Sequence, residues 1–181
     1  MLEEIVLPIT EPETEWVDGR PVQKVSPTRS HSRLQGAIVA ALIAWEPGFG
    51  EAGPEWRFRI APPGEARRPL VPDVAFVSRE RLRGFTADEL EAPPFAPDVA
   101  FEVLSPDDRA SEVQAKIDVY LRSGTALVVI VDPRARTLTL HEREGAPRRL
   151  AAGDVFAHPA LPGFSFDVGP FFARALDLPE S

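Results

Sequence analysis

The pentapeptide PDVAF occurs twice, at residues 72–76 and 97–101, and each copy brings an acidic residue into a strongly apolar stretch. Side chains alternate between the two faces of a β-strand, so Asp98 and Glu102 are expected on one face of the second strand. Asp73 is expected to share a face with Ala75 in the first strand. A carboxylate inside a buried strand is unfavourable unless it is paired, hydrogen-bonded or bound to a metal. Asp73 and Glu102 are therefore candidate ligands for a hard divalent cation.

Each candidate also has an ordinary structural interpretation. Asp73 follows a proline, a position where aspartate is commonly a turn residue. An edge position in the sheet, or a partner arginine, would satisfy Glu102.

Lys116 is the third residue that could take part in chemistry. It falls on a helix expected directly after the Glu102 strand, and the chain contains one other lysine, Lys24. A solvated helix lysine is the alternative. Two carboxylates and one ammonium are what metal-assisted phosphodiester cleavage needs, because the metal polarises the phosphate and activates a water. The ammonium would position that water or stabilise the developing charge.

Periodicity predicts the elements that must position these residues. An Asp-Gly turn at 18–19 between short apolar stretches predicts an N-terminal hairpin. Apolar residues from Leu34 to Trp45 recur at helical spacing, and a second helix is expected to start at 105–108 and to end at Gly124. Strands are predicted at 56–60, 70–77, 98–104, 126–131 and 137–141. The tail is expected to hold a short helix around Phe171.

The order of these elements predicts an α/β fold. The strand–helix–strand unit over 98–131 is expected to have parallel strands joined by a right-handed crossover, whereas the upstream strands favour antiparallel neighbours. We therefore expect a mixed central β-sheet flanked by α-helices, with an N-terminal β-hairpin. A length of 181 residues suits a single domain covering 1–181. Nothing around the two pentapeptides extends their similarity, which excludes a repeat architecture.

Composition excludes several classes of protein. The chain has no cysteine, which excludes disulfides, thiolate metal sites and cysteine nucleophiles. It has no glycine-rich phosphate loop and no G-x-S-x-G motif, and its three histidines lack zinc spacing. No apolar run is long enough to span a bilayer, and the acidic N-terminus lacks the basic segment of a secretory signal. We therefore expect a cytoplasmic protein with no membrane partner.

Charge is unevenly spread along the chain. The net charge of −8 argues against a protein that coats nucleic acid. Residues 57–83 nevertheless contain seven arginines and only three acidic residues. This stretch is either an ordinary solvated surface or an anion-facing patch beside the first pentapeptide. On the second interpretation, the candidate nucleic-acid contacts are Arg57, Arg59, Arg67 and Arg68.

A set of short motifs between residues 15 and 172 forms a specific combination. The motifs are VDG at 17–19, SPT at 26–28, His31, RPLVPDVA at 68–75, PDV at 97–99, EVLSP at 102–106, Lys116, Tyr120, Gly124, VDP at 131–133 and LPG at 161–163. Together they resemble a restriction endonuclease-like family of unknown function that is abundant in cyanobacteria. This family belongs to the PD-(D/E)XK nuclease superfamily.

The resemblance implies a restriction endonuclease-like fold and a nuclease that hydrolyses DNA with Mg²⁺ or Mn²⁺. It places Asp73 and Glu102 at the two acidic positions of the superfamily, with the backbone carbonyl of Val103 as a further metal ligand. The superfamily pattern expects a lysine where this chain has Leu104. The resemblance implies that Lys116 has taken over its role.

His31 matches a family position near the start of the first helix, and we expect it to be an accessory residue of the site. Helix capping or plain surface exposure is the alternative. The small size and the resemblance also predict a homodimer with twofold symmetry, in which DNA is the partner if the protein is active.

A different functional class remains open. The chain could be a weakly active or inactive nuclease-like module that binds a protein or a nucleic acid. The acidic net charge favours this module, whereas the presence of both acids and a lysine favours the nuclease. A cleft lined by arginines around Asp73 would support the nuclease, and a cleft filled by the C-terminal tail would support the module.

Overall fold

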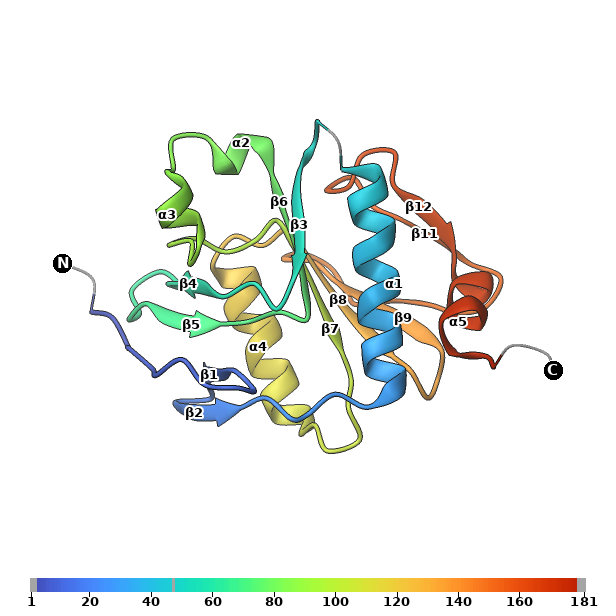
Figure 1. Ribbon diagram of the computed structural model, residues 1–181, viewed down its shortest axis with the longest axis horizontal. Helices are drawn as coiled ribbons and strands as arrows, with labels where there is room; N and C mark the ends of the chain where they lie inside the picture. The colour runs from blue at the N-terminus through green and yellow to red at the C-terminus, as the bar shows by residue number, and fades with distance from the viewer. Residues whose placement is uncertain (1–2, 47, 179–181) are drawn as a thin grey trace.

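The computed structural model describes residues 3–46 and 48–178, which build a mixed six-stranded sheet between layers of helices (Figure 1). The strands follow the order β10-β9-β8-β7-β6-β3 across the sheet. They are β3 (Gly50–Pro54), β6 (Val74–Ser78), β7 (Val99–Val103), β8 (Leu127–Asp132), β9 (Thr137–His141) and β10 (Arg148–Leu150). Strands β7 and β8 are parallel, and the other neighbouring pairs are antiparallel.

Helices cover both faces of this sheet. One face carries α1 (Arg29–Trp45) and α5 (Val168–Leu176), and the other carries α4 (Ala110–Arg122). Two hairpins lie on the α4 side: β1 (Thr14–Val17) with β2 (Arg20–Gln23), and β4 (Phe58–Ile60) with β5 (Arg68–Leu70). The remaining elements are α2 (Arg79–Leu82), α3 (Ala87–Leu90), β11 (Val155–Ala157) and β12 (Ser165–Asp167). The predicted α/β class, with its mixed sheet, flanking helices and N-terminal hairpin, is confirmed.

Strand alternation divides the core into two layers. Val74 and Phe101 belong to the apolar cluster beneath α1, whereas Ala75 and Ala100 belong to the cluster beneath α4. These two alanines are paired across β6 and β7 and share their cluster with the fully buried Tyr120. Because residues four apart lie on the same side of a helix, the packing of Tyr120 also directs Lys116 of α4 toward the sheet.

The predicted strand–helix–strand unit is confirmed, since α4 connects the parallel strands β7 and β8. The predicted start of its helix at 105–108 is wrong. The Asp108 side chain accepts the Ser105 N–H at 2.7 Å, which closes a turn before α4 begins at Ala110. A side chain that bonds local backbone in this way competes with helix formation.

Several further strands differ from the prediction. The strand expected at 70–77 is divided, because β5 ends at Leu70 and β6 begins at Val74. Strand β3 and the strands of the tail were not expected, whereas the helix around Phe171 was. No helix within the described ranges has the length and apolar character to cross a bilayer.

Candidate functional site

A cleft of about 900 Å³ lies at the end of β7, near the first turns of α1 and α4. Its walls come from residues 9–27, from the start of α1, from the loop after β7 and from α4. Asp73, Glu102, Lys116 and His31 all line it, so the structure brings these four candidates together. The catalytic and metal-binding roles assigned to them remain predictions.

Asp73 and Glu102 reach this cleft from neighbouring strands. The antiparallel register of β6 and β7 pairs Val74 with Phe101. One further step along the same ladder sets Asp73 opposite Glu102. The two pentapeptides therefore run in opposite directions, and their aspartates lie at opposite ends of the ladder.

Asp98 belongs to a structural contact at the far end of that ladder. Its Oδ2 accepts the Ser78 N–H at 2.7 Å, and its Oδ1 accepts from Arg81 Nε at 3.0 Å. Arg81 also donates to the carbonyl oxygens of Ala96 and Gly124. Asp98 thus anchors α2 to the sheet and takes no part in the cleft.

Asp73 is 3% exposed, and both its oxygens have partners. Oδ2 accepts the Val103 N–H at 2.7 Å and lies 3.2 Å from His31 Nε2, whereas Oδ1 lies 2.6 Å from Lys24 Nζ. Burial opposes ionisation, but the Lys24 ammonium and the His31 contact outweigh it and hold the pKa of Asp73 well below its usual range. An ionised carboxylate can only accept hydrogen bonds, so His31 Nε2 carries the proton in this contact.

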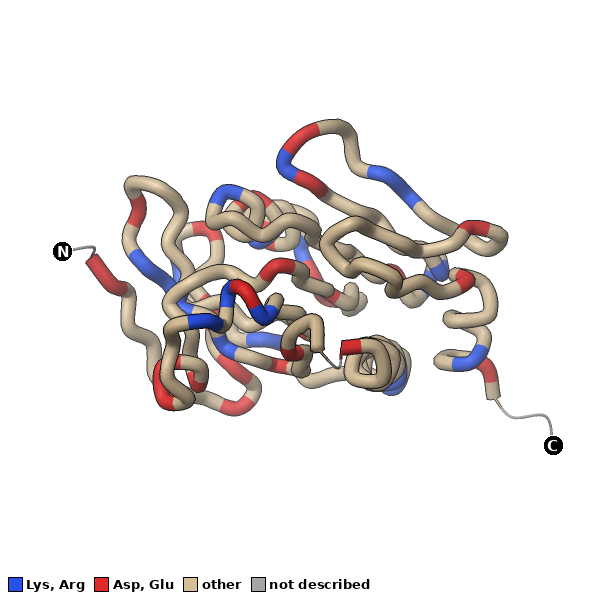
Figure 2. The backbone as a smooth tube through the Cα atoms, turned by 90° about the horizontal axis from the view of Figure 1, so that it is seen from above, with Lys and Arg blue, Asp and Glu red and all other residues tan. Residues whose placement is uncertain are grey.

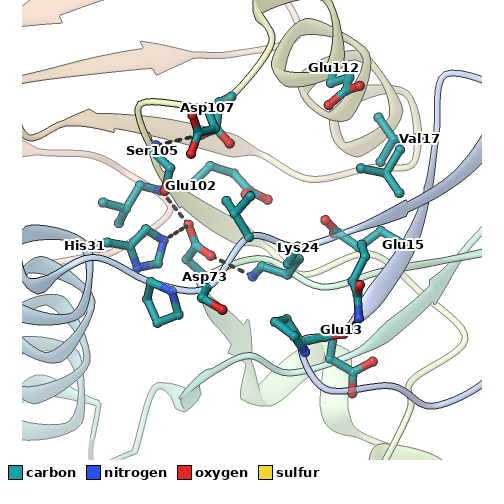
Figure 3. A pocket seen from close by; sticks show the side chains of 18 of the residues that line it. Glu13, Glu15, Val17, Lys24, His31, Asp73, Glu102, Ser105, Asp107 and Glu112 are labelled. Carbon is teal, nitrogen blue, oxygen red and sulfur yellow. Dashed lines mark hydrogen bonds and ion pairs between the residues drawn. The ribbon is translucent and has the colours of Figure 1, made fainter.

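His31 is therefore positioned by more than its place at a helix end. Helix α1 begins at Arg29, and the side chain of Thr28 accepts the His31 backbone N–H at 3.4 Å. This cap fixes the first turn, so that the buried imidazole points at Asp73 (Figure 3).

Glu102 is 9% exposed and has the opposite electrostatic behaviour. Its Oε1 accepts from the Tyr120 hydroxyl at 3.0 Å, and its Oε2 accepts from Lys116 Nζ at 2.7 Å. Burial raises the pKa of Glu102 to about 8 despite the Lys116 ammonium, and the nearby charges of Asp73 and Glu15 add to the increase. Two neighbouring carboxylates are thus held at very different proton affinities.

Two further side chains of the N-terminal hairpin segment reach the site, and sequence reasoning assigned neither of them a role there. Glu15 of β1 is 3% exposed and accepts from Lys116 Nζ at 3.0 Å. Lys24, just after β2, contacts Asp73. A signal existed for each: Glu15 alternates with Trp16 so as to share the buried face of Val17, and Lys24 is one of only two lysines.

The hairpin residues also explain why the strand expected at 70–77 is divided. The Val71 N–H donates to Glu15 Oε1 at 2.6 Å, and the Val71 carbonyl accepts from Lys24 Nζ at 3.1 Å. Both backbone polar groups of Val71 are thereby satisfied by side chains rather than by a neighbouring strand. This break sets the direction in which Asp73 enters the cleft.

The buried charges of the site do not balance. Glu15, Asp73 and Glu102 supply three buried carboxylates, whereas Lys24 and Lys116 supply two ammonium groups. Burial disfavours both ammonium ions, but the surrounding carboxylates outweigh it and raise the pKa of each lysine. Both lysines are therefore charged at neutral pH, and full ionisation would leave one negative charge in excess. A proton on Glu102, or a bound cation, would remove that excess.

The donor set fits a hard divalent ion in its chemistry. Asp73 and Glu102 offer carboxylate oxygens, which Mg²⁺ and Mn²⁺ prefer. The N–H and C=O of one strand residue point to the same side, so the Val103 carbonyl faces Asp73 as its N–H does. Within residues 3–46 and 48–178, no three acidic or histidine side chains are gathered as a metal cluster. Lys24 contacts Asp73 and Lys116 contacts Glu102, so a cation that binds these carboxylates must compete with the two ammonium groups.

The four arginines predicted to contact nucleic acid lie outside the cleft. Arg57 pairs with Glu13, Arg59 Nη1 lies 3.0 Å from Glu4 Oε1, and Arg68 pairs with Glu65. The backbone of Arg67 pairs with residues 3–5 through its N–H and its carbonyl. Figure 2 accordingly shows basic and acidic segments interleaved over the half of the molecule that carries the N-terminus. The role of these arginines toward nucleic acid remains a prediction.

The cleft itself is acidic. The acidic residues that line it are Glu11, Glu13, Glu15, Glu55, Asp73, Glu102, Asp107, Asp108 and Glu112, and the lysines and arginine are Lys24, Arg109 and Lys116. The described part of the C-terminal tail does not line it, since α5 packs on the other face of the sheet. Neither of the two expected arrangements, an arginine-lined cleft or a cleft filled by the tail, is therefore present.

Comparison with known proteins identifies the family of this chain. A family model described as "Uma2: Putative restriction endonuclease" matches residues 4–169. The chain belongs to this family. A solved structure described as a putative nuclease belonging to DUF820, from Anabaena variabilis, superposes with a TM-score of 0.83 at 24% sequence identity. The alignment covers 94% of this chain and 95% of that one, which supports the shared fold. A comparison with curated proteins found no match.

Proposed function

We propose that the chain is a metal-dependent nuclease that hydrolyses phosphodiester bonds of DNA. The observation that carries this proposal is the meeting of Asp73, Glu102 and Lys116 in one cleft. Asp73 directly precedes β6, Glu102 lies on the adjacent strand β7, and Lys116 lies on α4, the helix that follows. Membership of the Uma2 family supports it.

In this proposal, Asp73, Glu102 and the Val103 carbonyl hold a Mg²⁺ or Mn²⁺ ion. When bound, such an ion polarises the phosphate and lowers the pKa of a bound water. Lys116 holds the attacking water or stabilises the charge that develops on the phosphate. His31 is the accessory residue that keeps Asp73 in place.

Lys116 is suited to this task because its ammonium is fixed. It lies between Glu102 at 2.7 Å and Glu15 at 3.0 Å, and its side chain is 11% exposed. A lysine held in this way needs little reorganisation when charge develops nearby. Tyr120 fixes the other oxygen of Glu102 at 3.0 Å.

The acidic lining of the cleft makes the cation part of substrate binding. A phosphodiester carries a negative charge and would be repelled by the metal-free cleft. At the buried site the carboxylates exceed the ammonium groups by one charge, so a bound divalent ion would make the net charge there positive. The proposal therefore predicts that DNA binding in the cleft depends on the metal. Binding should also weaken as salt rises.

The test is cleavage of DNA and of RNA by the purified full chain at low salt, with Mg²⁺ or Mn²⁺ and with a chelator. Asp73→Asn and Glu102→Gln keep the side-chain shape but remove a ligand charge, and each should abolish cleavage. Lys116→Met should slow cleavage with less effect on metal binding. Cleavage that persists in Asp73→Asn would point to a contaminant and refute the assignment.

A second candidate is a weakly active or inactive nuclease-like module that binds a protein or a nucleic acid. The acidic lining of the cleft and the lysines seated on both candidate ligands favour it. Absence of DNA and RNA cleavage by the wild-type chain under all of these conditions would exclude the nuclease and favour the module.

We also propose a homodimer with a twofold axis, because two active sites are needed to cut both strands at one place. Light scattering at micromolar concentration tests it. A monomer mass would exclude this assembly.

A further inference from the structure

Lys24 lies directly on a candidate metal ligand, although no motif assigns it a role. Its Nζ is 2.6 Å from Asp73 Oδ1, 2.8 Å from Glu55 Oε2 and 3.1 Å from the Val71 carbonyl oxygen. The side chain of Lys24 is 13% exposed and that of Asp73 is 4% exposed. Figure 3 shows Asp73 between His31 and Lys24.

Oδ1 is the Asp73 oxygen that a cation could bind, provided that it displaces Lys24. Oδ2 is used by the Val103 N–H and by His31 Nε2. Oδ1 is contacted by Lys24, which thereby occupies the position on Asp73 that a divalent ion would need. The oxygens around the ammonium are also hard donors of the kind that Mg²⁺ and Mn²⁺ take.

The Lys24 ammonium stabilises the ionised form of Asp73 in the metal-free protein. An ionised Asp73 without a partner would be strongly unfavourable in the metal-free protein. Lys24 removes that penalty, so the site can fold before a metal arrives. The consequence is competition, because any ion that binds Asp73 must first displace the ammonium.

Two other acceptors can hold the Lys24 ammonium after a cation displaces it from Asp73. Glu55 and the Val71 carbonyl both accept from the same Nζ, and the Glu55 side chain is 43% exposed. Gln35 supports this arrangement, since its Nε2 donates to Glu55 Oε1 at 2.7 Å and to the Asp73 carbonyl at 2.9 Å. An exposed carboxylate can follow a moving ammonium at little cost.

We propose that Lys24 is an internal counterion that occupies the cation position on Asp73 and moves toward Glu55 when a divalent ion binds. This inference rests on the proposed metal-dependent function and adds a residue to it. Lys24 is a positioning residue here, because it acts through Asp73 and sets how strongly the site holds a cation.

The test measures Mn²⁺ binding to the full chain by titration calorimetry at low salt and pH 8, without substrate. Lys24→Met removes the charge, and Lys24→Gln removes it while keeping a donor for the Val71 carbonyl. Both variants should bind Mn²⁺ at least about tenfold more tightly than the wild type, because a cation no longer has to displace a charge from Asp73. Melting followed by circular dichroism should show that each variant is less stable than the wild type in chelator and gains more from Mn²⁺.

Arg109→Met is the matched control. Arg109 lines the same cleft, its side chain is 74% exposed, and its nearest carboxylate is Glu112 at 3.9 Å. Removing its charge should change Mn²⁺ affinity by less than about twofold to threefold, since the charge is screened by solvent.

The outcomes separate this inference from the function on which it rests. If the wild type binds Mn²⁺ and the folded Lys24 variants bind it equally or more weakly, Lys24 is no competitor and the inference is overturned, while the metal-dependent function stands. If neither the wild type nor any folded variant binds Mn²⁺, both the inference and the metal-dependent function fail. If Lys24→Met does not fold, Lys24→Gln decides, because it retains the hydrogen bond to Val71.

Discussion

Glu15 and Lys116 form a buried ion pair across 101 residues of sequence, with Glu15 Oε2 3.0 Å from Lys116 Nζ. The pair joins the N-terminal hairpin to α4, and the same ammonium also donates to Glu102 Oε2 at 2.7 Å. Glu15 therefore controls where the lysine of the candidate site can lie.

The first prediction is that Glu15→Gln lowers the turnover number by roughly tenfold or more while leaving the substrate KM nearly unchanged. The amide oxygen still accepts the Val71 N–H, but the charge that fixes Lys116 is lost. A positioning residue that acts through Lys116 cannot matter once that lysine is gone. The double variant with Lys116→Met should therefore be no slower than Lys116→Met alone.

Glu112→Gln is the control for this cycle. Glu112 lines the cleft from α4 but pairs with Arg20 and Arg109 rather than with a lysine. Its effect should add to that of Lys116→Met. Additive effects of Glu15→Gln and Lys116→Met would contradict a role of Glu15 in positioning the lysine.

The second prediction concerns stability against pH. Because the pKa of Glu102 is raised to about 8 in the folded protein, the folded state holds a proton that the unfolded chain releases above its ordinary value of 4.5. The free energy of unfolding should therefore fall as pH rises from 4.5 to 8, by up to about 1.4 kcal/mol per pH unit. Glu102→Gln imitates the protonated form and removes this loss.

Urea unfolding of the wild type and of Glu102→Gln at pH 5, 6.5 and 8, in chelator, gives the measurement. The variant's stability relative to the wild type should increase steadily with pH, since the other titrating groups cancel in the difference. Parallel pH profiles for the two proteins would show that Glu102 is ionised throughout. Asp73 lies outside this window, because its lowered pKa makes its contribution disappear only in strong acid.

These two acids could be predicted from the sequence because their signal is local. Each acid is marked by a carboxylate next to or among the apolar residues of one strand. The antiparallel pairing of the two strands then places Asp73 opposite Glu102. Glu15 and Lys24 depend instead on how the hairpin docks against residues 71–73, which lie 47 to 56 positions away. No spacing rule connects segments so far apart.

The unpredicted strand β3 has a similar explanation. Its sequence, GEAGP, has two glycines and a proline and is typical of a turn. Pairing with β6 makes it a strand, and the close approach requires glycine. A Cβ at Gly50 would lie 2.0 Å from the Val77 carbonyl oxygen. The start of α4 was misplaced for a local reason, since the Asp108 side chain closes a turn where a first helical turn was expected.

The third prediction separates two substitutions of Asp73 in metal-free buffer. Asp73→Ala should destabilise the protein by about 3–5 kcal/mol, because it leaves the buried Lys24 ammonium without its closest carboxylate and the Val103 N–H without an acceptor. Asp73→Asn keeps an acceptor oxygen for Val103 and should cost clearly less. Chemical unfolding of both variants beside the wild type provides the comparison, and equal losses would mean that the hydrogen bond to Val103 contributes nothing.

The fourth prediction concerns the arginines outside the cleft. Arg57 and Arg59 are paired with Glu13 and Glu4 of the N-terminal segment, so Arg57→Gln and Arg59→Gln should change DNA affinity by less than about twofold. Freeing both arginines with Glu4→Gln and Glu13→Gln should instead strengthen DNA binding by roughly threefold or more, and more steeply at low salt. Fluorescence anisotropy with labelled DNA, in the slowly cleaving Lys116→Met background that keeps the metal ligands, measures both effects.

Glu11→Gln is the matched control, because Glu11 lines the cleft as Glu13 does and, within the described residues, pairs with no arginine. Its loss of charge should therefore free neither arginine. If the Glu4 and Glu13 variants bind DNA no better than this control, the arginines do not face nucleic acid, and the proposed interface must be confined to the metal-bearing cleft.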